Sequence, residues 1–195
     1  MDDFPSDIPR EWIISNIELR PIVAHKSQII LYLPDSIGYL SGLQILNCSW
    51  NSILNLPESI CNLSGLQELY CNFNLLRELP ESISHLINLQ VLNCSCNLLT
   101  KLPESIGLLG NLRKLYCSQN QLTKLPESIC HLSGLQVLFL DGNKLRNPHI
   151  LMDNVINYIK IKKVIKEINL INIKNTLCEQ LIIDLDSASV ILLFY

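Results

Sequence analysis

Hydrophobic residues return along this chain in a pattern with a fixed period. Five copies of the pattern LPxSIxxLxxLxxLxCxxNxLxx follow one another over residues 33–55, 56–78, 79–101, 102–124 and 125–147. The leucines and isoleucines keep their places in each copy, whereas the residues between them change. One unit of this length cannot bury its own apolar side, so neighbouring units must stack. The period therefore predicts a solenoid whose coils share one hydrophobic core.

Each copy also predicts its own local structure. Its second half predicts a short strand that turns away at an asparagine. The proline of the LP pair suits the first turn of a short helix, because the N–H group that proline lacks is not needed there. We therefore expect an α/β fold: a curved horseshoe segment with a parallel concave β-sheet, short helical or extended convex segments, and terminal caps.

The ends of the chain depart from the repeat. We interpret residues 1–32 as an N-terminal tail and a degenerate capping repeat, because a shift by one period places Val23 opposite Leu46 and Ile30 opposite Ile53. Residues 148–195 are expected to form a C-terminal cap that is helical at first, over 148–159. The sequence does not place the segment after residue 160.

Composition and charge limit the kinds of partner. The chain has 195 residues, of which 48% are hydrophobic, and a formal charge of -3. A charge this small does not favour nucleic acid or an anionic membrane as the partner. The acidic N-terminus lacks the apolar stretch of a secretory signal, and the apolar run at 190–195 is too short to cross a bilayer. We expect a cytoplasmic, monomeric protein in a reducing compartment.

Cysteines recur with the same period. Cys48, Cys71, Cys94 and Cys117 occupy one position of successive copies, and Leu140 fills that position in the fifth. Exchange with leucine indicates a buried site, so we expect reduced core thiols rather than a partly oxidised ladder or a metal site.

The other cysteines follow different rules. Cys61 and Cys130 share another slot three copies apart, too far to pair with each other. Cys96 lies in a variable slot that we expect to face solvent. A reactive or modifiable thiol is the alternative there to an inert one.

Other polar columns have structural interpretations. An acidic residue follows the proline in every copy, where the partial positive charge of a helix N-terminus favours it, although a surface for a basic partner or calcium is the alternative. The repeated asparagine is expected to satisfy backbone groups of the turn. No nucleophile, base and orienting group converge, and no phosphate-binding or metalloprotease motif is present. We therefore expect no enzymatic activity and no cofactor or metal.

Functional evidence comes from the slots that vary between copies. Four slots around each strand change freely, and we expect them to face solvent on the concave side. They are rich in aromatic residues and poor in charge, which is the composition of protein-interface centres. The alternative is that the rings only pack on one another. The residues predicted to bind a protein partner are Trp50, Glu68, Tyr70, Phe73, Asn93, Lys114, Tyr116, Gln119, Phe139 and Asp141.

The LPxSIxxLxxLxxLxxxxNxL repeat, over residues 33–147, resembles the Ras-group class of intracellular leucine-rich repeat proteins, including the plant Ras-group-related and scribble-like proteins. The run Gly142-Asn143-Lys144-Leu145, with Pro148 after it, resembles the terminal repeat of that class, although Lys144 replaces its proline. The Asn-Cys-Ser runs at 47–49 and 93–95 are similar to leucine-rich repeat proteins of giant amoebal viruses. The resemblance implies a non-enzymatic scaffold or adaptor that binds a protein on its concave face.

Two alternative functions stay open. The chain could be the substrate-recognition subunit of a ubiquitin-ligase complex, with residues 1–30 recruiting the ligase. It could also be a regulator that uses the basic segment 158–175 for nucleic-acid or membrane contact, although the solvated face of a capping helix explains those lysines as well.

Overall fold

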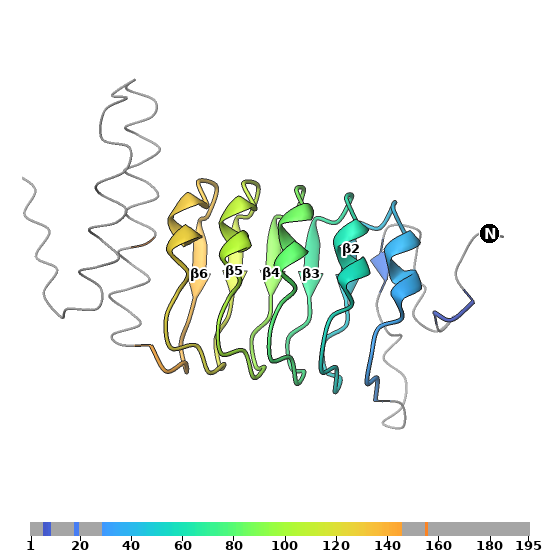
Figure 1. The fold of residues 1–195 in the computed structure, drawn as a ribbon, viewed down its shortest axis with the longest axis horizontal. Helices are drawn as coiled ribbons and strands as arrows, with labels where there is room; N and C mark the ends of the chain where they lie inside the picture. The colour runs from blue at the N-terminus through green and yellow to red at the C-terminus, as the bar shows by residue number, and fades with distance from the viewer. Residues whose placement is uncertain (1–5, 9–17, 20–28, 146–154, 156–195) are drawn as a thin grey trace, which may run out of the picture.

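The computed structural model describes residues 6–8, 18–19, 29–145 and 155, and within these ranges the chain forms a stack of similar coils (Figure 1). Each coil of the repeat region, over residues 33–145, has a short strand on one side and a 3-10 helix on the other. The strands are β1 (Glu18–Leu19), β2 (Ile45–Asn47), β3 (Glu68–Tyr70), β4 (Val91–Asn93), β5 (Lys114–Tyr116) and β6 (Val137–Phe139). The helices are η2 (Asp35–Tyr39), η3 (Glu58–Asn62), η4 (Glu81–His85), η5 (Glu104–Leu108) and η6 (Glu127–His131).

The strands form one parallel sheet whose order follows the sequence from β1 to β6. From β2 onward every register step equals the period of the sequence repeat, so that Leu46 pairs with Leu69 and Leu69 pairs with Leu92. The same step continues through Leu115 to Leu138. The predicted solenoid, with equivalent slots side by side, is therefore confirmed.

The first strand corrects our alignment of the N-terminal cap. Leu19, not Val23, pairs with Leu46, and Glu18 pairs with Ile45, so this register step is longer than the repeat period. The end of the coil still obeys the regular period, because the N–H of Ile30 donates to Asn51 just as the N–H of Ile53 donates to Asn74. The first coil thus holds four additional residues between its strand and Ile30. The pair Glu18-Leu19 repeats Glu68-Leu69 of β3, a match that a fixed period misses.

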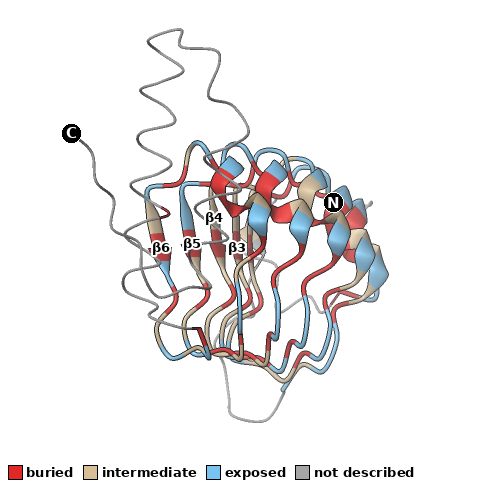
Figure 2. Ribbon diagram, turned by 60° about the vertical axis from the view of Figure 1, so that its left-hand side comes forward, coloured by how far each residue is buried: buried red, intermediate tan, exposed pale blue. Residues whose placement is uncertain are grey.

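The core lies between the strand layer and the helix layer, as the buried residues in Figure 2 show. Leucine and isoleucine from each coil fill it, and those of the central coils are wholly inaccessible to solvent, among them Leu69, Leu92 and Ile83. Cys48, Cys71, Cys94 and Cys117 are buried beside them and are free thiols, as expected. Cys130 differs, because its sulfur takes part in a disulfide bond.

Proline and acid together start each 3-10 helix. Pro80 precedes η4 in an extended conformation, and its carbonyl accepts a hydrogen bond from the N–H of Ile83. Glu81 is the first helical residue, and an acid occupies this place in all five helices. These acids also contact the next coil, since the hydroxyl of Ser82 donates to Glu58. Their position at the helix N-termini agrees with the structural interpretation of the acidic column.

Several predictions fall mainly outside the described residues. Val155 is helical and buried against the core, at a point inside the helix predicted over 148–159. The rest of that helix, the segment after residue 160 and the basic segment 158–175 lie outside the described ranges. The same holds for most of residues 1–30, to which one alternative function assigns ligase recruitment.

Candidate protein-binding face

Two columns of side chains run across the solvent side of the sheet. In each three-residue strand the middle residue is buried and the two flanking residues are partly or fully exposed. The first column carries Ile45, Glu68, Val91, Lys114 and Val137, and the second carries Asn47, Tyr70, Asn93, Tyr116 and Phe139. Tyr70, Tyr116 and Phe139 thus lie in one line on the concave face, as the sequence predicted.

Tyr70 forms a pair with Glu68 on the same strand. The phenol donates a hydrogen bond of 2.7 Å to the Glu68 carboxylate. Burial, this hydrogen bond and the charge of Glu68 raise the pKa of Tyr70 to about 12. The phenol therefore stays neutral, and the hydrogen bond holds its ring in one orientation at the centre of the face.

Tyr116 and Phe139 stack on one another across β5 and β6. Their ring centroids are 5.5 Å apart and their planes differ by 8°. Such a pair adds roughly 0.5 to 1.5 kcal/mol beyond the burial of its area. Ring packing along the sheet, the structural alternative for these residues, is thus present. Phe139 nevertheless keeps 45% of its surface exposed, so the pair also presents an apolar surface to solvent.

Polar groups border the rings where each strand ends. Asn93 accepts a hydrogen bond from the N–H of Ser95, and Asn47 accepts one from Ser49 in the same way. The carbonyl of Asp141 accepts from the N–H of Gln119 in the preceding coil. These bonds fix the corners of the coils, and they hold Asn93 in place between Tyr70 and Tyr116 in the second column.

The fourth variable column has a backbone conformation that the sequence analysis missed. Trp50, Phe73, Cys96 and Gln119 have φ values of 61°, 56°, 55° and 55°, in the left-handed region. The fifth member is Gly142 with φ 72°, and glycine is the residue that adopts this conformation without steric cost. That glycine was the signal available in the sequence. All five positions face solvent at least in part, as expected.

Two rings of this column stack closely at the corner of the first coils. The centroids of Trp50 and Phe73 are 3.7 Å apart and their planes differ by 12°. Trp50 is 72% exposed, so its contact with Phe73 covers only a small part of the indole. The stacked pair extends the apolar surface from the concave face to the edge where the coils turn.

The described residues give no sign of reaction chemistry. Burial raises the pKa of the partly exposed Cys96 thiol, which is opposite to the shift that activates a nucleophilic cysteine. Burial also raises the pKa of Cys48 to about 12. Within the described ranges no three metal-ligating side chains come together. His85 and His131 lie at the exposed ends of η4 and η6, on the outer side.

Comparisons with known proteins agree with this architecture. Models of leucine-rich repeat families match residues 42–63 and 87–145. A leucine-rich repeat protein of Leptospira interrogans is 34% identical, with a TM-score of 0.67, over 73% of this chain and 36% of its own. The chain thus spans about a third of that protein. No curated protein matches the chain significantly.

Two plant receptors share the fold. The leucine-rich repeat ectodomain of the membrane receptor kinase GASSHO1/SCHENGEN3 from Arabidopsis thaliana, solved with Casparian strip integrity factor 2, is 27% identical, with a TM-score of 0.60, over 67% of this chain and 16% of its own. The plant peptide hormone receptor RGFR1, solved with RGF2, is 36% identical, with a TM-score of 0.55, over 58% of this chain and 19% of its own.

The location of the protein stays a prediction. In the part of the chain that the structure describes, no helix has the length and apolar character needed to span a bilayer.

The repeat period, the single parallel register and these comparisons give one answer: the chain belongs to the leucine-rich repeat family.

Proposed function

We propose that this protein is a non-enzymatic interaction module that binds a protein partner on the concave face of its sheet. The observation that carries the proposal is the line of Tyr70, Tyr116 and Phe139, which keep one register and stay accessible on a face with few charges. The proposed binding residues are Trp50, Glu68, Tyr70, Phe73, Asn93, Lys114, Tyr116, Gln119, Phe139 and Asp141.

The chemistry of these side chains suits protein recognition. Tyrosine and tryptophan give a large contact area with few rotatable bonds, and they dominate the energetics of protein interfaces. Tyr70 is already held by Glu68, and Tyr116 is held by its stack on Phe139. A partner that packs on these rings therefore does not have to order them, which lowers the entropic cost of binding.

The plant receptors support a polypeptide ligand of modest size. Both were solved in complex with another factor, and one is described as a peptide hormone receptor. Coils of this protein stack at the spacing of paired strands, about 4.8 Å. The five coils from β2 to β6 then span roughly 20 Å, which matches about six residues of an extended peptide.

The test removes two rings from the concave face. Tyr70→Ala combined with Tyr116→Ala in the full chain should abolish capture of the partner from the native cell, as measured by quantitative affinity purification. Tyr39→Ala is the matched control, because Tyr39 is 80% exposed at the end of η2, in the helix layer. The control should capture the same partner at the level of the unaltered chain.

Folding must be measured with the same proteins. Loss of the Tyr116 stack and of the hydrogen bond from Tyr70 to Glu68 is expected to cost about 2 kcal/mol in all, too little to unfold the stacked coils. Circular dichroism and thermal unfolding of the double variant should show this small loss. A double variant that stays folded and captures the partner as well as the control does would refute the concave face as the binding site.

A further inference from the structure

A second apolar surface lies along the edge where each coil turns from its strand toward the next LP pair. This turn edge is separate from the helix layer and adjoins the concave face at Trp50 and Phe73. Its N-terminal part carries large apolar side chains that are 39% to 73% exposed, which we call the turn-edge patch: Ile29, Leu31, Tyr32, Trp50, Leu54 and Phe73.

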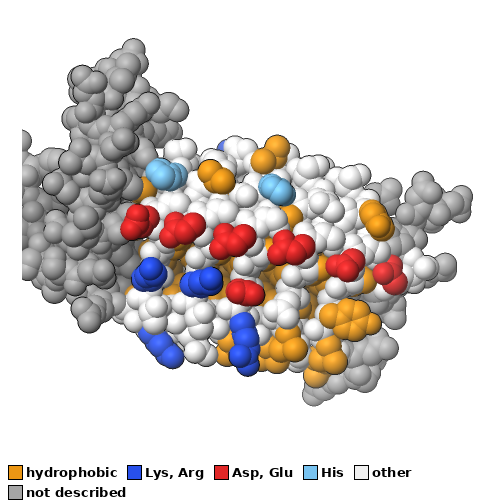
Figure 3. Space-filling model, viewed as in Figure 1, with side chains coloured by type: hydrophobic (Ala, Val, Ile, Leu, Met, Phe, Trp, Pro, Cys, Tyr) orange, Lys and Arg blue, Asp and Glu red, His pale blue; other side chains and the backbone are white. Residues whose placement is uncertain are grey.

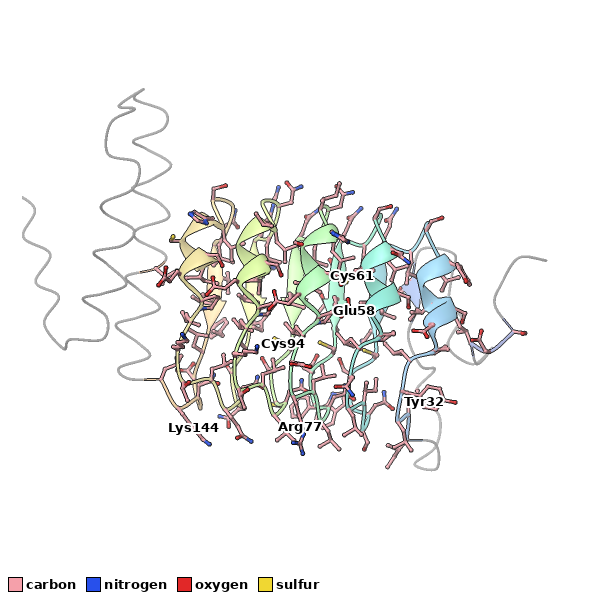
Figure 4. The ribbon with its side chains drawn as sticks, in the orientation of Figure 1. Tyr32, Glu58, Cys61, Arg77, Cys94 and Lys144 are labelled. Atoms are coloured by element: carbon pink, nitrogen blue, oxygen red, sulfur yellow. The ribbon has the colours of Figure 1, made fainter. Side chains whose placement is uncertain are left out.

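Beyond Phe73 the turn edge becomes mostly polar, although Leu75, in the slot of Ile29, is also 40% exposed. The slot of Leu31 and Leu54 is filled by Arg77, Thr100 and Thr123 in the later coils, all exposed. The slot of Tyr32 is filled by Asn55 and Glu78 and then by Lys101 and Lys124. Figure 3 shows the hydrophobic side chains gathered on the lower edge of the N-terminal coils, with cations on the coils that follow. In Figure 4, Tyr32, Arg77 and Lys144 lie along this edge.

The area of the patch is large for a monomer. A fully exposed large side chain presents about 200 Å², so the exposed fractions of the six residues correspond to roughly 700 Å². The largest apolar patch of a typical monomer covers about 300 to 600 Å². One side of a standard protein interface buries about 800 Å². The patch therefore has the size of one half of a stable interface.

We propose that the turn-edge patch binds a second copy of this chain. A two-fold axis through the patch sets the apolar side chains of one copy against the same side chains of the other, since such interfaces are self-complementary. Arg77 and Glu78, adjacent and exposed at the border of the patch, have opposite charges. In the two-fold arrangement Arg77 of each copy faces Glu78 of the other. The proposed dimer differs from the monomer that we expected from the sequence alone.

The geometry of the edge favours this pairing. The turns of successive coils line up in a row at the lower edge of the solenoid (Figure 1). Two such rows can approach along their length while the strands of both concave faces stay open, so dimerisation leaves Tyr70, Tyr116 and Phe139 available and covers only Trp50 and Phe73 of the proposed binding residues. The patch itself carries no lysine or arginine, and Figure 3 shows a row of acidic side chains crossing the solenoid above it. Both features disfavour an anionic bilayer as the occupant.

The experiment measures the oligomeric state of the full chain. Sedimentation velocity from about 1 to about 100 μM should show a species of twice the 22.2 kDa chain mass. Leu31→Lys combined with Leu54→Lys should weaken dimerisation more than about 30-fold, the effect expected when hot-spot side chains are replaced by charge. Tyr39→Lys combined with Leu108→Lys is the matched control in the helix layer, and it should dimerise like the unaltered chain.

A charge exchange tests the two-fold arrangement itself. Arg77→Glu should weaken the dimer, and adding Glu78→Arg to it should restore the affinity to within about 3-fold, because opposite charges again face each other. A chain that is monomeric at every concentration overturns the proposal, whether or not it sediments with phosphatidylserine vesicles. A dimer that is unaffected by the Leu31 and Leu54 changes overturns it as well. None of these variants alters Tyr70 or Tyr116, so this result is independent of partner capture.

Discussion

The side chain of Asn97 accepts a hydrogen bond of 2.9 Å from the backbone N–H of Leu76, which lies one coil earlier in the chain. Its amide group donates to the carbonyls of Cys71 and Cys94, at 3.0 and 3.1 Å. One buried side chain therefore satisfies backbone groups of two adjacent coils at the point where both leave the sheet. The same bonds recur at Asn74 and Asn120. The role that the sequence predicted for this column is confirmed.

Asn97→Ala is expected to lower the free energy of unfolding by about 3 kcal/mol, because it leaves a buried N–H and two carbonyls without this partner. Urea denaturation followed by circular dichroism measures the change. Asn88→Ala is the control, since the exposed amide of Asn88 donates only to the carbonyl of Ser64, and it should cost less than about 1 kcal/mol. Equal losses in the two variants would contradict the structural role of the buried column.

The sequence predicted those parts of the fold that repeat. Because Leu46 and its equivalents recur with one period, their common register followed from that period. The same argument placed Tyr70 and Tyr116 on one face and Cys94 in the core. Comparison of the copies with one another was enough, because a buried slot tolerates few side chains whereas an exposed slot tolerates many.

The parts that depart from the period could not be predicted in this way. Leu19 pairs with Leu46 because the first coil is longer than the others, and a fixed shift cannot detect such an insertion. The left-handed backbone at Cys96 was hidden because four of the five copies carry residues other than glycine there. The side chains of one turn-edge slot change from apolar Leu31 to charged Arg77. They form a continuous surface only when the coils are stacked.

The column of residues with left-handed backbone, which includes Cys96 and Gly142, predicts opposite changes in stability for two substitutions. Gly142→Ala should destabilise the protein by about 1 kcal/mol, because an L-residue at φ 72° is strained. Cys96→Gly removes that strain at φ 55° and should be neutral or stabilising by up to about 1 kcal/mol. Cys96→Ala keeps the strain and serves as the reference for the loss of the thiol. Thermal unfolding compares the three variants, and a glycine at position 96 that is less stable than the alanine would contradict this account.

The pair of Tyr70 and Glu68 leads to a spectroscopic prediction. Glu68→Gln should lower the pKa of Tyr70 from about 12 toward its ordinary value of 10.0, because it removes the negative charge that disfavours the phenolate. The shift should be partial, since burial is the largest cause and is retained. Absorbance of the phenolate between pH 9 and 13, with Tyr70→Phe to identify the transition, measures it. An unchanged titration in Glu68→Gln would show that the hydrogen bond does not form in solution.

Alkaline pH should weaken the fold through its buried thiols. The thiol of Cys48 has a pKa of about 12 in the folded chain and 9.0 as its ordinary value, because burial disfavours the thiolate. Between these values the unfolded chain has lost a proton that the folded chain keeps. The stabilisation is therefore complete below pH 9 and decreases as the pH rises, by about 1.4 kcal/mol per pH unit for each such thiol. Cys71 and Cys117 act in the same direction, because burial raises the pKa of Cys71, and the hydrogen bond with Cys94 together with burial raises the pKa of Cys117.

Cys48→Ala isolates one of these contributions. Urea denaturation at several values between pH 8 and 10.5, under reducing conditions, should show that the free energy of unfolding of this variant falls less steeply with pH than that of the unaltered chain. Leu140→Ala is the matched control, because Leu140 fills the same buried slot in the last copy and cannot titrate. It should lower the free energy of unfolding by a similar amount at every pH and leave the slope unchanged. If Cys48→Ala also leaves the slope unchanged, the thiol of Cys48 is not held in its neutral form by the core, and alkaline unfolding must begin elsewhere in the chain.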